Sequence, residues 1–230
     1  MQEQMKKVLE QAARLQKLIP DAVLVGGTAA YLYAEHRHSF DHDHIITDLE
    51  ERFDIILESL EREKDWITNR VIHGKIILGE LGGIEAGIRQ LIRKKALEFQ
   101  KFQINEISLN VPAIEEMIRI KAFMIIKRNQ LRDYLDFAAL SDKTGIPASA
   151  LILENLDEYY SDDTSNTSIY EKPALSQLIR QLSNPQPKDH RNISQLENYK
   201  GTIDKWKNWN NVIEVCQNVA KELMKEKNNA

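Results

Sequence analysis

The sequence predicts an α/β protein with a mixed-sheet core over residues 1–111 and a helical domain over residues 112–230. Two observations favour this division. Short apolar or alternating runs bounded by glycine, which are typical of strands, are confined to the first half. Apolar residues at three- and four-residue steps, which are typical of packed helices, dominate the second half. The length of 230 residues suits one large domain or two small ones.

The first half is expected to alternate between helices and strands. An apolar stripe predicts a helix over residues 3–18, which Pro20 ends. The elements expected next are a strand over 22–25, a helix over 29–35 with Thr28 as its N-cap, a strand over 41–47 and a helix from Asp48 to about Lys64.

Later residues predict a hairpin and then helices. The runs 75–81 and 84–91 flank Gly82-Gly83, a pair that favours a tight turn. A further strand is expected over 102–111, and Pro112 fits the first turn of a helix that follows. Helices are then expected to about residue 127, over 131–143 and over 203–225.

Composition narrows the function classes. The formal charge is −4, from 31 basic and 35 acidic residues, so no global basic field indicates nucleic-acid binding. The single cysteine, Cys216, rules out a disulfide framework and is expected to fill a helix face. The N-terminus lacks the apolar core of a signal peptide, and no apolar run reaches the length of a membrane span. The expectation is a cytoplasmic protein without a membrane partner.

An Asp-x-Asp pattern offers the clearest chemistry. On a strand, Asp41 and Asp43 point to one face and lie about 6.5 to 7 Å apart along the backbone. Their oxygens can converge on Mg²⁺, whose other ligands are water and substrate phosphates. The glycine turn at Gly26-Gly27 opens a helix, where backbone N–H groups can bind phosphate. The combination is typical of a magnesium-dependent nucleotide site.

A third carboxylate is expected from a neighbouring strand. Glu85 is the first candidate, and Glu80 is the alternative, because strand register is not readable from the sequence. Gly87 and Arg89 share the face of Glu85. A glycine there permits close approach of a ligand, and an arginine can meet a phosphate.

These residues resemble a known family. Gly26-Gly27-Thr28, then twelve residues, then Asp41-x-Asp43 resembles the DNA polymerase β-type nucleotidyltransferase superfamily. The lead-in over residues 36–39 resembles its AbiEii/AbiGii branch, known as toxins of bacterial toxin–antitoxin and phage-abortive systems. Segments 118–121 and 132–136 resemble that branch's lysine and aspartate motifs. The sequence departs from the superfamily pattern at Thr28, often serine, and at His42 and His44, usually apolar.

The resemblance implies a nucleotidyltransferase core and a set of roles. The reaction implied is transfer of a nucleoside monophosphate from an NTP to an acceptor hydroxyl, with Mg²⁺ or Mn²⁺ as cofactor. Transfer RNA or another RNA is the implied acceptor, and an antitoxin protein is the implied partner. The roles implied are metal binding by Asp41 and Asp43, triphosphate binding by Gly26, Gly27, Thr28 and Lys121, and completion of the catalytic site by Asp136. In the reading that combines the resemblance with the strand pattern, Glu85 joins the metal ligands, and Arg37 and Ser39 join the residues that bind the triphosphate. The site is expected between the two halves.

Several of these residues also have simpler explanations. Lys121 falls in an apolar helical stripe and can extend to its rim. Asp136 lies four residues after Arg132, so an ordinary ion pair explains both, and Asp133 reads as solvated or capping. The basic run 93–95 reads as solvated surface or as a guide for an RNA backbone.

Two further functions remain open. One is a catalytically inactive member of the fold that binds a nucleotide or a protein. The other is a metallohydrolase, because four histidines crowd two aspartates within nine residues. However, His42 and His44 should point away from Asp41 and Asp43, which favours packing against a helix with satisfied nitrogens.

Overall fold

The computed structural model describes residues 3–93, 95–160, 173–199 and 201–229, with side chains to residue 225. The chain divides into two compact units. The first comprises Met1–Leu32, His38–Ile92 and Ala96–Ala113, and the second comprises Tyr33–Arg37, Arg93–Lys95 and Ile114–Ala230. The main division therefore falls at residues 113 and 114, and two short segments of the first half join the helical unit.

The first unit is built on a five-stranded mixed sheet. Its elements are α1 (Glu3–Leu18), β1 (Val23–Val25), α2 (Gly26–Ala34), β2 (Asp41–Ile46), α3 (Leu49–Glu61), β3 (Trp66–Ile72), β4 (Ile76–Leu81), β5 (Ile84–Gln90), β6 (Phe99–Ile104) and β7 (Ile107–Pro112), with the last two residues of α2 in the second unit. The strand order is β1-β2-β5-β4-β3, and β6 and β7 form a separate pair. Strands β2 and β5 run parallel, and the other neighbours run antiparallel. This architecture confirms the expected mixed α/β class.

Two tight turns, at Gly82-Gly83 and at Asn105, form the β-hairpins of this unit. Gly82 and Gly83 both have positive φ, 58° and 76°, and close the β4–β5 hairpin as expected. The prediction of a single strand over residues 102–111 is wrong, because two strands, β6 and β7, cover this region. Asn105 adopts a φ of 52° and turns the chain back, so β6 and β7 form a second hairpin. Pro112 ends β7 instead of opening the next helix.

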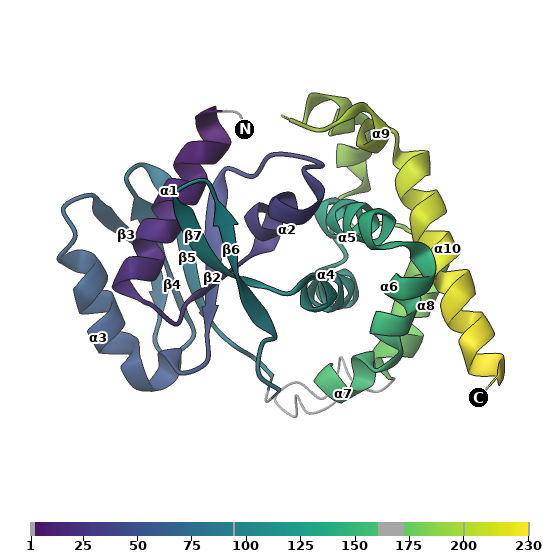
Figure 1. The fold of residues 1–230 in the computed structure, drawn as a ribbon, viewed down its shortest axis with the longest axis horizontal. Helices are drawn as coiled ribbons and strands as arrows, with labels where there is room; N and C mark the ends of the chain where they lie inside the picture. The colour runs from purple at the N-terminus through teal and green to yellow at the C-terminus, as the bar shows by residue number, and fades with distance from the viewer. Residues whose placement is uncertain (1–2, 94, 161–172, 200, 230) are drawn as a thin grey trace. The chain divides into compact units, whose positions relative to one another are not determined.

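The core of the first unit lies on one face of the sheet. Helices α1 and α3 supply apolar side chains to it, and Figure 1 shows α1 (purple) and α3 (blue) as helices beside the strands. Its central members are Leu15, Ile19, Ile46, Leu49, Phe53, Ile56, Leu60, Ile77, Leu81 and Ile88. Burial of this kind contributes roughly 25 cal/mol per Å² of apolar surface. The opposite face of β2, β5 and β4 carries Asp41, Asp43, Glu85 and Glu80.

The second unit is helical in its described residues. Its elements are α4 (Ile114–Arg128), α5 (Leu131–Thr144), α6 (Ile146–Glu154), α7 (Leu156–Tyr160), α8 (Ala174–Ser183), the 3₁₀ helix η1 (His190–Asn198), α9 (Asp204–Lys207) and α10 (Trp209–Asn229). Helix α10 packs along α5, α6 and α8 (Figure 1). Cys216 lies buried on this helix, as expected, and burial raises the pKa of its thiol.

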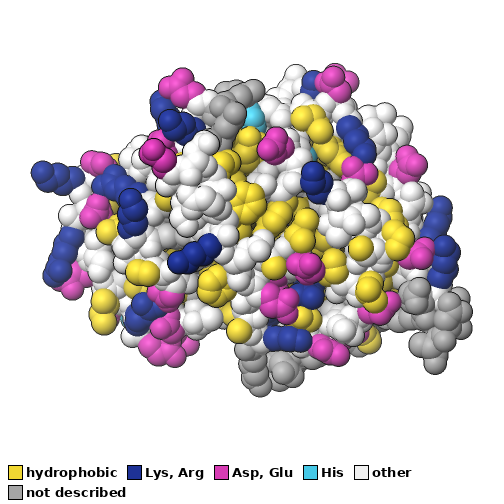
Figure 2. Space-filling view, viewed as in Figure 1, with side chains coloured by type: hydrophobic (Ala, Val, Ile, Leu, Met, Phe, Trp, Pro, Cys, Tyr) yellow, Lys and Arg dark blue, Asp and Glu magenta, His cyan; other side chains and the backbone are white. Residues whose placement is uncertain are grey.

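Charged side chains are well mixed on the surface. Figure 2 shows Lys and Arg side chains interspersed with Asp and Glu on the side that carries α1 and α3. The pairs there include Lys6 with Glu10 and Arg62 with Glu58. This pattern agrees with the near balance of 31 basic and 35 acidic residues. Among the described residues, no helix is both long and apolar enough for a membrane span.

Candidate active site

The Asp-x-Asp pattern lies on β2, where its two carboxylates share a face. Asp41 and Asp43 are partly exposed, whereas His42 and His44 between and after them are fully buried. This alternation follows from the two-residue repeat of a strand. The expected orientation of the two carboxylates, on the face of β2 opposite the histidines, is therefore confirmed.

Two glycines lie next to the Asp43 side chain, and one of them leaves room for its carboxylate. Gly26 follows β1 with a φ of 76°, and a Cβ built on it would lie 3.7 Å from Asp43 Oδ2. Gly87 on β5 is the register partner of Asp43. A Cβ built on Gly87 would lie only 2.2 Å from Asp43 Oδ1. The carboxylate therefore occupies the space that any other residue at position 87 would fill.

Two hydroxyls hold the start of β2. The Ser39 hydroxyl donates to Asp41 Oδ1 at 2.7 Å, and the Thr28 hydroxyl donates to the Asp41 backbone oxygen at 2.5 Å. Thr28 was expected as an N-cap, which is wrong, because α2 already begins at Gly26. Its hydroxyl ties α2 to β2. The first-turn N–H groups of α2 have no partner within the helix, so a phosphate can still use them.

Strand register separates the two candidates for the third carboxylate. Asp41 is the direct partner of Glu85 on β5, and Glu85 is the direct partner of Glu80 on β4. All three lie on one row and one face. Strands are about 4.8 Å apart, so Glu85 starts one spacing from Asp41 and Glu80 starts about 10 Å away. Glu85 is therefore the better placed of the two.

The donor set fits one Mg²⁺ through two carboxylates. Asp41 and Asp43 share a face of β2, and the Asp43 carboxylate lies where a side chain at Gly87 would stand. Among the described residues, no three His, Cys, Asp or Glu side chains are gathered closely enough to hold a metal ion. Mg²⁺ commonly takes one or two carboxylates and completes its shell with water and substrate oxygens. The residues present match that pattern.

A cation of the protein contacts one of these carboxylates. The Nε atom of Arg89 on β5 lies 3.5 Å from Asp43 Oδ1. Both side chains are partly exposed, at 43% for Arg89 and 32% for Asp43. Solvent screens such a pair, so it is weak.

The two buried histidines of β2 lie on the opposite face from the aspartates and cannot share a metal ion with them. The rings of His42 and His44 meet edge to face, with centroids 5.4 Å apart. Their four ring nitrogens have no hydrogen-bond partner among the described residues, so the expectation of satisfied nitrogens is wrong. Burial lowers the pKa of His42 to about 4 and holds the pKa of His44 well below its ordinary value. Both imidazoles are neutral, and both face away from Asp41 and Asp43.

The second unit holds a separate buried cluster centred on Asp136. Its Oδ1 accepts from His36 Nε2 and Arg37 Nε, each at 2.7 Å. Its Oδ2 accepts from Lys121 Nζ at 2.8 Å and from Arg37 Nη2 at 3.0 Å. All four side chains are almost fully buried. These four donors fill the roughly four acceptor positions of a carboxylate.

This cluster corrects several expectations. Arg37 and Lys121, expected at the triphosphate, both bind Asp136, and their hydrogen bonds together with that of His36 leave its carboxylate no further acceptor position. Lys121 is buried and does not extend to a rim. The prediction that Asp136 pairs with Arg132 is wrong, because Asp136 pairs with Arg37 and Lys121. Asp133, expected in solvent, is also buried, paired with Arg128 at 2.6 Å.

The protonation states in the cluster follow from its charges. Burial alone would raise the pKa of Asp136, but Arg37 and Lys121 hold it well below its ordinary value. Burial lowers the pKa of His36, although its hydrogen bond to Asp136 acts the other way. The cluster therefore contains one anion, two cations and a neutral imidazole. Charges buried this way are costly unless paired, and here each is paired.

A second buried charge cluster was missed in the sequence. Arg93 was expected on a solvated surface, which is wrong: its guanidinium lies 2.7 Å from Glu116 in the interior, and Nη1 donates to the Tyr160 hydroxyl at 3.1 Å. Lys94, in the same basic run, lies outside the described residues. Lys95 stands 3.7 Å from the ring centroid of Tyr159. A basic run adjacent in sequence to a strand gives no sign of such burial.

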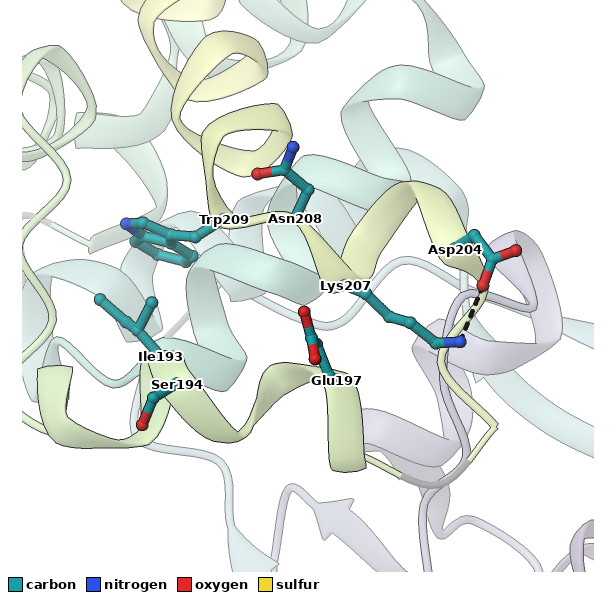
Figure 3. Close-up of a pocket in the computed structure, with 7 residues that line it drawn as sticks. All are labelled: Ile193, Ser194, Glu197, Asp204, Lys207, Asn208 and Trp209. Carbon is teal, nitrogen blue, oxygen red and sulfur yellow. Dashed lines mark hydrogen bonds and ion pairs between the residues drawn. The ribbon is translucent and has the colours of Figure 1, made fainter.

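The helical unit also has a shallow pocket of about 460 Å³ between η1, α9 and the start of α10 (Figure 3). Trp209 and Ile193 form its apolar part, and Glu197 lies in the middle of the view. Lys207 pairs with Asp204 at 2.7 Å. None of the residues expected to transfer a nucleotide lines it.

Comparison with solved structures shows a shared fold. The crystal structure of JHP933 from Helicobacter pylori matches with a TM-score of 0.50 and 16% identity, over 100% of this chain and 97% of that chain. A putative nucleotidyltransferase from H. pylori matches with a TM-score of 0.49 and 15% identity, over 98% and 99% of the two chains. An antigenic nucleotidyltransferase-like protein from Paracoccidioides brasiliensis reaches 0.47 and 16%, over 76% and 93%. At such low identity the likeness to JHP933 concerns the fold alone.

Comparison with curated sequences finds a partial match. The mycolic acid-containing lipids exporter MmpL11 of Mycolicibacterium smegmatis is 31% identical over 119 residues, and the heme uptake protein MmpL11 of Mycobacterium tuberculosis is 30% identical over 118. Each match spans 51% of this chain but 11% of the transporter's length. Export and uptake are therefore properties of those longer proteins. No protein-family model matches the sequence.

Proposed function

We propose that this protein is a magnesium- or manganese-dependent nucleotidyltransferase. One observation carries the proposal: Asp41 and Asp43 emerge on the same face of β2, and the missing side chain of Gly87 lets the Asp43 carboxylate lie over β5. A pair of carboxylates next to the N-terminus of a helix suits a cation together with a triphosphate. The superfamily resemblance of the Gly26-Gly27-Thr28 and Asp41-x-Asp43 motifs supports the same class.

The reaction transfers a nucleoside monophosphate. An acceptor hydroxyl oxygen forms a bond to the α-phosphorus of an NTP, the bond from that phosphorus to the bridging oxygen breaks, pyrophosphate leaves, and the hydroxyl proton passes to water. The bound cation would neutralise phosphate charge and lower the barrier to attack. Asp41 and Asp43 would hold it, Ser39 would orient Asp41, and the first turn of α2 would hold phosphate oxygens. Glu85 is the register partner of Asp41 and would assist in holding the cation.

The acceptor and the biological role come from the resemblance to the AbiEii/AbiGii branch. On that basis the acceptor is a transfer RNA or another RNA, and the protein acts as a toxin that an antitoxin protein holds inactive. The motif of residues 36–39 supports this assignment at the level of sequence.

The test is incubation with Mg²⁺ and each α-labelled NTP in turn, with total tRNA or total protein as acceptor. We expect label in one acceptor with the wild type and none with Asp43→Asn, which keeps the side-chain shape but removes the charge. Asp48→Asn is the matched control, because Asp48 contacts only Arg52 among the partners described and lies outside the site. Label that persists in Asp43→Asn contradicts the proposal.

A second candidate is a nucleotide-binding protein without turnover. Such a protein would need only the Asp41 and Asp43 pair to hold a cation, without the third carboxylate that a two-metal clamp usually requires. In that case the wild type would bind an NTP with Mn²⁺ and transfer no label to any acceptor. Loss of that binding in Asp43→Asn would assign the same site to the non-catalytic role.

A further inference from the structure

Arg89 stands on the same open face as the two aspartates. It lies two residues after Gly87 on β5, and its register partner on β2 is Ile45. Because Gly87 has no Cβ, the Asp43 carboxylate leans over β5 and comes within 3.5 Å of Arg89 Nε. The arginine thus approaches a carboxylate that is placed to hold a cation.

Only one edge of the Arg89 guanidinium is used. The contact runs through Nε, and 3.5 Å is long for a charge-assisted hydrogen bond. Within the part of the chain that the structure describes, Asp43 is the only ion-pair partner of the Arg89 side chain. The two terminal nitrogens therefore present a planar fork of donors, at a side chain that is 43% exposed. Such a fork matches two phosphate oxygens at once.

We infer that Arg89 is a triphosphate-binding residue that also serves as the exchangeable counter-ion of Asp43. Without ligand, the guanidinium neutralises part of the Asp43 charge. When a divalent cation binds Asp43, two positive groups stand close together and repel each other. An incoming triphosphate carries several negative charges and satisfies both, so the guanidinium turns from the carboxylate to the phosphate. This inference rests on the proposed function.

The two roles predict effects of opposite sign for one substitution. In Arg89→Ala, Mn²⁺ alone should bind about two- to five-fold more tightly, because a weak competitor for Asp43 is gone. In the presence of saturating Mn²⁺, an NTP should bind about ten-fold or more weakly, because charge-assisted hydrogen bonds to phosphate are lost. A residue with only a structural role would not shift the two constants in opposite directions.

Two further variants sharpen the test. Arg89→Lys keeps the charge but loses the fork, so it should bind Mn²⁺ like the wild type and an NTP with intermediate affinity. Arg70→Ala is the matched control. Arg70 is an exposed arginine on β3 whose register partner is Leu78, and Leu78 is the partner of Gly87. It therefore shares the row and face of Asp43 but lies three strand spacings away, roughly 14 Å.

The experiment measures two dissociation constants for each variant: Mn²⁺ alone, by electron paramagnetic resonance of the free ion, and each NTP with Mn²⁺, by calorimetry. Opposite shifts in Arg89→Ala with no shift in Arg70→Ala support the inference. Constants within two-fold of the wild type, or shifts in the same direction, overturn it. If the wild type binds both ligands and Asp43→Asn no longer binds Mn²⁺, an overturning result for Arg89→Ala contradicts only the role of Arg89 and leaves the proposed function in place. If the wild type binds neither ligand, the proposed function falls and the inference falls with it.

Discussion

Lys121 and Asp136 form an ion pair of 2.8 Å in the interior of the helical unit, where their side chains are 2% and 1% exposed. Lys121 lies on α4 and Asp136 on α5, so the pair joins two helices that are consecutive in the chain. Arg37 and His36 donate to the same carboxylate. Asp136 thus fixes His36 and Arg37 to α4 and α5 within the helical unit. We interpret it as a residue that stabilises this unit, since its acceptor positions are all occupied.

Removing the charge of Asp136 should destabilise the protein strongly. In Asp136→Asn, the buried cations of Arg37 and Lys121 lose the carboxylate that pairs with both, and breaking a buried pair costs about 3–5 kcal/mol. The free energy of unfolding in urea measures this loss. Asp142→Asn is the control on the same helix, since Asp142 pairs with Lys205 at the surface and an exposed pair contributes at most about 1 kcal/mol. Equal losses in the two variants would contradict the role of Asp136.

Stability should fall on mild acidification because of the buried histidines of β2. Burial lowers the pKa of His42 to about 4 in the folded protein, whereas an unfolded histidine titrates near 6.5. Between these values the unfolded chain binds more protons, so the free energy of unfolding decreases as pH falls and does so by about 3 kcal/mol for His42 alone. His44 acts in the same direction.

Urea unfolding at several pH values from 7 to 4 measures this slope. His42→Leu keeps an apolar side chain at the site and removes the titrating group, so its slope should be shallower than that of the wild type. Equal slopes would show that His42 is protonated in both states or in neither.

A methyl group at position 87 should disable the site without unfolding the protein. In Gly87→Ala the new Cβ would meet Asp43 Oδ1 at 2.2 Å, so the carboxylate must turn away. Displacing a catalytic group by about 1 Å can cost about 100-fold in rate. We expect label transfer to fall by about that factor and Mn²⁺ binding to weaken. Thermal unfolding checks that the fold is kept, and wild-type transfer in a folded variant would argue against Asp43 as a metal ligand.

The cluster around Glu116 should contribute to stability and not to chemistry. Glu116 is fully buried and contacts Arg93 at 2.7 Å and Arg119 at 3.4 Å. Glu116→Gln leaves these cations without its charge and should cost about 3 kcal/mol or more. Glu115→Gln, at the exposed neighbouring position on α4, should cost less than about 0.5 kcal/mol. Label transfer per folded molecule should be unchanged in both, and a selective loss in Glu116→Gln would place this cluster in the site.

Much of the first unit was predictable because its determinants are local. The alternation of Asp41, His42, Asp43 and His44 sets which side chains share a face. Gly82-Gly83 specifies a tight turn by its backbone freedom, and the hairpin formed as expected. The turn at Asn105 was missed because a single left-handed asparagine leaves a weak local pattern.

The sequence by itself determined the mixed α/β class, the strand that carries the two aspartates and the glycine that opens α2. Tertiary structure alone decided that Glu85 rather than Glu80 stands beside Asp41, that Arg89 meets Asp43, and that Arg37 and Lys121 both pair with Asp136. The physical reason is the sequence separation over which each interaction acts. Side-chain direction along a strand or helix repeats over a few residues, whereas register and buried charge pairing join segments up to 100 residues apart, as His36 and Asp136 are.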